Sequence, residues 1–143
     1  MTAKQISVFL ENKPGSLAKF TEVLDQNKID MHALSVADTP DFGIVRMIVD
    51  DSALTATILK EAGYVLSITP VLAVEIPNVP GGLNKVLQIL KTKAINVAYT
   101  YAFTSKKVGS AYMVFRVPDN DAATKVLAEE GVKVICQKEL LDL

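Results

Sequence analysis

Cysteine, histidine and tryptophan are almost missing from this sequence of 143 residues. It contains one cysteine, Cys136, one histidine, His32, and no tryptophan. One cysteine cannot form a disulfide within the chain, and one cysteine with one histidine is too few for a zinc site of the Cys/His type. Carboxylates are the only other metal-binding side chains that the sequence has in sufficient number. Cys136 and His32 would need the fold to bring them together as a nucleophile pair, and no local motif favours this. We therefore predict no metal site, no cofactor and no catalytic residues.

A charge excess of one sign is also lacking. Lys and Arg number 15 against 16 Asp and Glu, a formal net charge of -1, so no basic field for nucleic acid or an anionic membrane is indicated. The longest nearly apolar stretch, residues 64–74, is far shorter than the roughly 20 residues that span a bilayer. The first residues do not resemble a secretory signal. We expect a cytoplasmic protein that binds neither nucleic acid nor membrane.

An internal repeat is the most informative feature that is present. Asn12–Lys19, with the sequence NKPGSLAK, returns 66 positions later as Asn78–Lys85, NVPGGLNK, with five of eight residues identical. Further along the shift becomes 68 and relates Gly63 to Gly131. Repetition at a fixed period indicates that each copy is one structural unit. The chain therefore reads as two similar halves.

Both halves predict the same order of elements. Alternating apolar residues such as Ile6, Val8 and Leu10 indicate a strand that ends at Asn-x-Pro-Gly. An apolar stripe at helical spacing follows, and we expect the helix to start at the Pro-Gly, because proline suits a first helical turn. A predicted hairpin, a helix capped by Asp and ended by glycine, and a last strand, residues 64–69 or 132–137, complete each half.

The order βαββαβ, found twice, predicts an α+β protein of two ferredoxin-like domains, residues 1–69 and 70–143. Each domain would have an antiparallel four-stranded sheet with both helices on one face. A half of this size leaves the other sheet face and the edges exposed. We therefore expect the two domains to pack together, and the protein to form a homodimer.

A strand followed by Asn-x-Pro-Gly-x-Leu at the start of a helix, within a βαββαβ unit, resembles the ACT domain. ACT domains are small ligand-binding modules of regulated enzymes in amino-acid metabolism. Both halves match the motif, so the chain is similar to a stand-alone tandem ACT protein. Ser7–Leu17, together with Arg46-Met47 in a later strand, is also similar to the regulatory subunit of acetohydroxyacid synthase. The resemblance implies a ligand held between domains, by this loop from one and by strand residues from the other.

The motif also has a physical reason to bind an amino acid. Unpaired N–H groups of Gly15, Ser16 and Leu17 at the start of a helix would suit a carboxylate. The side-chain oxygen of Asn12 could accept from an ammonium group while its NH₂ donates elsewhere. His32, in the following strand, is a secondary candidate. The predicted ligand-binding residues are Asn12, Pro14, Gly15, Ser16, Leu17, His32, Asn78, Pro80, Gly81, Gly82 and Leu83.

Other interpretations remain open at this point. Asn-x-Pro-Gly is also good turn chemistry, so either copy could be structural only. The protein could sense an amino acid by itself, or act as the regulatory subunit of a separate biosynthetic enzyme such as acetohydroxyacid synthase. A small enzyme on this fold would need an acid–base pair in a pocket, and the sequence has neither a second histidine nor a phosphate-binding loop of the GxxxxGK[ST] type.

Overall fold

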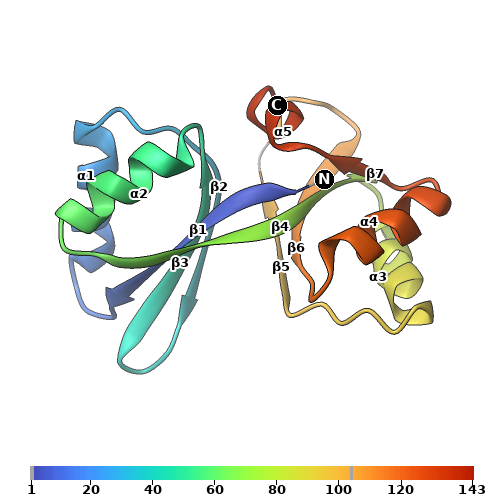
Figure 1. Cartoon of the computed structure of the whole chain (residues 1–143), viewed down its shortest axis with the longest axis horizontal. Coiled ribbons are helices and arrows are strands. Elements are labelled where there is room, and N and C mark those ends of the chain that lie inside the picture. Colours follow the sequence, from blue (N-terminus) through green and yellow to red (C-terminus); the bar gives the residue numbers. More distant parts are fainter. Residues whose placement is uncertain (1, 104) are drawn as a thin grey trace. The chain divides into compact units, whose positions relative to one another are not determined.

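The chain divides into two compact units in a computed structural model that describes residues 2–103 and 105–143. One unit consists of residues 4–69, and the other of residues 70–143 together with the first residues of the chain. Figure 1 shows the elements of each unit in chain order. The strand β4 (Val65–Pro77) runs through the boundary and contributes to both units.

The first unit has the predicted order of elements: β1 (Ala3–Glu11), α1 (Ser16–Gln26), β2 (Met31–Asp38), β3 (Phe42–Val49), α2 (Ser52–Glu61) and the start of β4. The strand order is β2-β3-β1-β4. β3 pairs antiparallel with both β1 and β2. Side chains of β1 and β3 form the core with Phe20 and Leu24 of α1 and Leu59 of α2. The two helices therefore cover one face of this sheet.

The second unit repeats this arrangement with the rest of β4, α3 (Gly82–Thr92), β5 (Tyr99–Phe103), β6 (Ser110–Arg116), α4 (Asn120–Glu129) and β7 (Lys133–Ile135). Its strand order is β5-β6-β4-β7, and all three pairs are antiparallel. The core joins β4 and β6 to Val86 and Leu90 of α3 and Leu127 of α4. The predicted α+β fold of two ferredoxin-like domains is confirmed.

The predicted signals for the second helix of each unit are confirmed. The side chain of Asp51 accepts a hydrogen bond from the Leu54 N–H at 2.9 Å, and that of Asp119 accepts from the Ala122 N–H at 3.0 Å. Such caps satisfy N–H groups that a helix start leaves without partners. Gly63 and Gly131 follow the two helices at φ 91° and 74°, a conformation that glycine adopts at little cost.

The predicted start of the other two helices is wrong by one or two residues. α1 begins at Ser16 and α3 at Gly82, so the proline lies in the turn that precedes each helix. The residues at the helix boundary are Gly15 and Gly81, with left-handed φ values of 83° and 86°. The turn therefore needs glycine for its backbone conformation, and proline does not occupy the first helical position.

Two features go beyond the predicted pattern. Gln5 and Ser7, which alternate with the apolar residues of β1, are also buried, and the Gln5 side chain donates to Ser7 Oγ at 3.1 Å. The last strand of the second unit has only three residues and is followed by α5 (Gln137–Leu141). Helix α5 forms because Glu139 caps it at Cys136 and Leu140 is buried.

Candidate functional site

The first Asn-x-Pro-Gly turn connects the end of β1 to α1 and is pinned to the neighbouring hairpin. The Asn12 N–H donates to the Asp41 carbonyl at 3.4 Å, and the Asn12 side-chain NH₂ donates to the Thr39 carbonyl at 3.0 Å. The Asn12 amide therefore has its NH₂ engaged, and its oxygen is the acceptor that remains. Of the predicted roles of Asn12, the structure shows the donation by its NH₂ group, to the Thr39 carbonyl.

The N–H groups at the start of α1 are only partly free. Ser16 N–H donates to the Lys13 carbonyl at 3.2 Å, so its predicted availability for a ligand is wrong. Lys19 N–H donates to the Gly15 carbonyl at 2.9 Å. The N–H groups of Gly15 and Leu17 have no backbone or side-chain acceptor among the described residues. A carboxylate at this helix start would find two donors instead of three.

The second turn has the same geometry with one difference. Gly82 N–H donates to the Val79 carbonyl at 3.1 Å, which matches the bond made by Ser16 in the first turn. Gly82 is buried, and a Cβ atom there would lie 2.3 Å from the Pro77 carbonyl oxygen. The glycine at this position is therefore explained by close packing against the end of β4. Leu83 N–H remains without an acceptor among the described residues.

A hollow of about 300 Å³ lies beside the first turn, within the first unit. It lies between the end of β1, the start of α1 and the turn that joins α2 to β4. Phe9, Leu10 and Tyr64 give it apolar and aromatic walls. The lining residues are Phe9, Leu10, Glu11, Lys13, Ser16, Lys19, Ala62, Gly63 and Tyr64.

The second unit has a hollow of about 490 Å³ at the equivalent place. Applying the repeat shifts of 66 and 68, positions 9, 10, 11, 16, 19, 63 and 64 of the first hollow correspond to 75, 76, 77, 82, 85, 131 and 132 of the second. Residues from the turn before β6 enlarge it. Its lining residues are Glu75, Ile76, Pro77, Gly82, Lys85, Val86, Lys107, Gly109, Ser110, Gly131, Val132 and Lys133.

Lysines outnumber carboxylates in both hollows. The first contains Lys13 and Lys19 against Glu11, and the second contains three lysines against Glu75. Glu11 pairs with Lys13. Lys19 and its repeat counterpart Lys85 form no ion pair among the described residues. Each hollow therefore offers one uncompensated ammonium group, a feature that suits an anionic group of a ligand.

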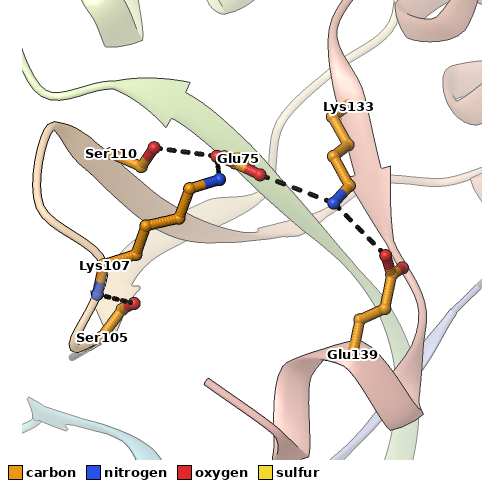
Figure 2. Close-up of polar contacts among 6 residues, drawn as sticks. All are labelled: Glu75, Ser105, Lys107, Ser110, Lys133 and Glu139. Atoms are coloured by element: carbon orange, nitrogen blue, oxygen red, sulfur yellow. Dashed lines mark hydrogen bonds and ion pairs between the residues drawn. The ribbon is translucent and has the colours of Figure 1, made fainter.

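Glu75 is the centre of a polar network in the second hollow (Figure 2). Its Oε1 atom accepts from Ser110 Oγ at 2.8 Å and also pairs with Lys107. Its Oε2 atom lies 3.7 Å from Lys133 Nζ, and that nitrogen lies 3.3 Å from Glu139 Oε1. The network therefore joins β4, the turn before β6, β7 and α5.

This network lowers the pKa of two carboxyl groups. Hydrogen bonds from Lys107 and Ser110 hold the pKa of Glu75 below its ordinary value, and they outweigh the opposing effect of burial. The Cys136 N–H and Lys133 do the same for the pKa of Glu139. The pairing with Glu75 raises the pKa of Lys107. Each of these groups is thus held in its charged form.

The structure brings the predicted residues only partly together. Ser16 and Gly82 line the two hollows. Asn12 is turned toward the β2–β3 hairpin, and His32 lies at the other end of the sheet. Met31, beside His32, pairs with Val49, whereas Asp38 and Leu10 both pair with Gly43 near the turn. The other predicted residues lie outside the hollow linings. Leu17 and Leu83 belong to the first turns of α1 and α3. The rest form the turns before these helices: Pro14, Gly15, Asn78, Pro80 and Gly81.

Sequence reasoning missed several lining residues. Lys19 and Lys85 are identical within the repeat, and this identity could have singled them out. Gly63 and Gly131 were recognised only as helix ends. Glu75, Lys107 and Lys133 carry no repeat signal, because Phe9 and Val65 stand at the positions equivalent to Glu75 and Lys133.

Two other classes of site have little support in the part of the chain that the structure describes. No group of three or more His, Cys, Asp or Glu side chains there is arranged to hold a metal ion. Asp51, one of the acidic residues near the β3–α2 junction, serves as a helix cap instead. None of the described helices has the length and apolar character needed to cross a membrane.

Solved structures include proteins of the same fold over nearly the whole chain. The chain is 39% identical to protein BT0572 from Bacteroides thetaiotaomicron, with a TM-score of 0.92 and coverage of 100% of this chain and 98% of that one. The regulatory subunits of aspartate kinase from Thermus thermophilus and Thermus flavus are 17% and 19% identical, with TM-scores of 0.65 and 0.60. In both cases the match covers 88% of this chain and 90% of the other.

The sequence comparisons agree with the fold. No curated protein sequence matches this chain significantly. The family described as an ACT domain pair matches residues 1–143, and the structure consists of two βαββαβ units. The chain belongs to the family of ACT domain pairs.

Proposed function

We propose that this protein is a non-catalytic regulator that binds an amino acid at its strand-to-helix turns. The single observation that carries the proposal is the duplicated hollow. Seven lining positions correspond under the repeat, and each hollow lies against the start of a helix. In both units the hollow also brings a lysine, Lys19 or Lys85, next to the start of a helix, and this combination suits a carboxylate.

The carboxylate of the ligand is proposed to bind at the helix start. In the first unit the N–H groups of Gly15 and Leu17 are available, and Lys19 lines the adjoining hollow. In the second unit the Leu83 N–H group is likewise available, and Lys85 lines the hollow. Free N–H groups at a helix start favour an anion, and a nearby ammonium group adds to that preference.

The ammonium group of the ligand is proposed to bind at Asn12. Because the Asn12 NH₂ donates to the Thr39 carbonyl at 3.0 Å, its Oδ1 atom is an acceptor with a defined orientation. A neutral amide can thus accept from a cation beside a site that attracts an anion. Pro14, Pro80 and Gly81 shape the turns, and Asn78 occupies the position of Asn12 in the second one. His32, at the far end of β2, has no part in this arrangement.

A second candidate is the regulatory subunit of a separate enzyme of amino-acid biosynthesis. The segment Ser7–Leu17 is similar to the regulatory subunit of acetohydroxyacid synthase, and solved proteins with this fold include regulatory subunits of aspartate kinase. We further propose a cytoplasmic homodimer. Co-purification with a catalytic chain would favour this candidate, and light scattering of the purified protein tests the dimer.

The amino-acid proposal is tested by thermal unfolding of the purified protein with each of the 20 amino acids at millimolar concentration. A ligand at about 100 times its dissociation constant stabilises by roughly 2.7 kcal/mol, which corresponds to a shift of several degrees. Lys19→Ala and Lys85→Ala should reduce that shift, while Lys60→Ala, on an exposed face of α2, should not. Absence of a shift with all 20 amino acids would contradict independent amino-acid sensing.

A further inference from the structure

We infer that the second hollow is coupled to the C-terminal helix α5 through Lys133, so that a carboxylate ligand entering the hollow loosens α5. This inference rests on the proposed function, because it takes the carboxylate of an amino acid as the ligand. In this inference α5 is the element that responds to the ligand, and Lys133 is the residue that transmits the response.

Lys133 stands between the hollow and the helix. It lines the hollow from β7, and its Nζ atom lies 3.7 Å from Glu75 Oε2 and 3.3 Å from Glu139 Oε1. Figure 2 shows the Lys133 side chain extending between the two carboxylates. One ammonium group is therefore shared between a strand of the sheet and the first turn of α5.

Helix α5 depends on such contacts for its position. It has only five residues, and a helix this short is not stable by itself in water. The contacts that hold it include the buried Leu140 and the carboxylate of Glu139, which accepts from the Cys136 N–H at 3.0 Å. Lys133 binds that same carboxylate. Removing Lys133 from Glu139 thus removes one of the contacts that hold α5 in place.

A ligand can compete for Lys133 because its present pairs are weak. The Lys133 side chain is 57% exposed and that of Glu139 is 45% exposed, and exposed ion pairs contribute little to stability. Glu75, only 14% exposed, keeps Lys107 and Ser110 as partners when Lys133 turns away. The carboxylate of an amino acid in the hollow can therefore take Lys133 without leaving Glu75 buried and unpaired.

Among its described residues, the first unit has no equivalent ion-pair link between its hollow and a helix. Phe9 and Val65 stand where the second unit has Glu75 and Lys133, and no helix follows the matching point of β4. The two hollows therefore lie at equivalent positions, but only the second is linked to a helix that can respond to a ligand. Ligand binding in the second unit is the event that changes the C-terminal surface.

Cys136 allows a direct test, because it is the only cysteine in the chain and caps α5. The rate of its alkylation by iodoacetamide, an uncharged reagent, is measured on the full chain with and without each of the 20 amino acids. An amino acid that raises the unfolding temperature less in Lys85→Ala than in the wild type binds the second hollow, and it should also raise this rate. Lys133→Ala should raise the rate without any ligand by about two- to fivefold, as expected for loss of an exposed ion pair.

Two variants complete the test. Glu139→Gln breaks the same ion pair from the other side, so its alkylation should be accelerated like that of Lys133→Ala. Lys138→Ala removes the same charge from α5, but Lys138 forms no ion pair among the described residues, so its alkylation rate should equal that of the wild type. An equal acceleration in Lys138→Ala would overturn the inference.

The outcomes separate the two proposals. If an amino acid raises the unfolding temperature, and Lys85→Ala reduces that rise, but the Cys136 rate stays unchanged, the coupling is wrong and amino-acid binding stands. If neither measurement responds to any of the 20 amino acids, both proposals fail. If the rate rises with ligand in the wild type and no longer changes in Lys133→Ala, the coupling through Lys133 is established.

Discussion

Gly82 packs so closely against Pro77 that a Cβ atom at position 82 would lie 2.3 Å from the Pro77 carbonyl oxygen. The repeat places Ser16 at the same point of the first unit, where a side chain is accommodated. Two turns of nearly identical sequence therefore differ in how tightly the helix start meets the end of the strand. At Gly82 the added Cβ atom would meet a backbone carbonyl oxygen, and backbone atoms can move little to relieve such a contact.

Gly82→Ala should therefore destabilise the protein by about 1–3 kcal/mol or more, the usual cost of overpacking. Urea unfolding followed by circular dichroism measures this loss. Ser16→Ala, at the matching position, should stay within about 0.5 kcal/mol of the wild type. Equal losses in the two variants would show that the close approach at Gly82 has no energetic consequence.

Gly15→Ala tests the left-handed turn separately from steric contact. A Cβ atom on Gly15 would meet nothing within 4 Å, but the residue has a φ of 83°, and this conformation costs a non-glycine residue about 1–2 kcal/mol. We expect a loss of stability of that size in urea unfolding. Gly43→Ala, where φ is not left-handed and the nearest atom is 3.6 Å away, provides the control and should lose less.

Asn12→Ala should weaken amino-acid binding by about 1–3 kcal/mol, the cost of leaving a polar ligand group without its partner. Asn12 is exposed, so the unfolding temperature without ligand should change little. Isothermal titration with the amino acid that gives the largest thermal shift measures the effect. Unchanged affinity, or a loss matched by a large fall in stability, would remove Asn12 from the proposed site.

Glu75→Gln should change how stability depends on pH. The pKa of Glu75 is lowered in the folded protein, chiefly by the hydrogen bond from Lys107. Its contribution to the free energy of unfolding is complete above the ordinary value of 4.5 and is lost as the pH falls through the lowered folded-state pKa. Glu75→Gln should therefore be less stable than the wild type at pH 7, and the difference should vanish at acid pH.

Urea unfolding from pH 7 to pH 2.5 provides the measurement. Glu129→Gln makes the same chemical change at an exposed residue of α4 that forms no ion pair among the described residues. Its stability should remain close to that of the wild type at pH 7. A difference between wild type and Glu75→Gln that stays constant over the whole pH range would show that the ionised form of Glu75 is not responsible.

Much of the fold follows from local signals in the chain. The Asp51 and Asp119 caps, the glycines at positions 63 and 131 and the repeated turn act within a few residues of themselves, so they could be identified without coordinates. The predicted start of α1 is wrong because Pro14 has a backbone angle that fits both a helix and a turn. The left-handed conformation of Gly15, which decides between them, depends on how the strand end approaches the helix.

The candidate site, too, is partly evident from the sequence and partly evident only from the structure. The repeat by itself determined that there are two similar units and that both carry the Asn-x-Pro-Gly turn. Only the tertiary structure decided that Lys19 and Lys85 line matching hollows, that Asn12 binds Thr39, and that Lys133 joins Glu75 to α5. Turn and cap preferences are properties of neighbouring residues, whereas hollows and ion networks arise from side chains that are distant in the sequence and adjacent only after folding.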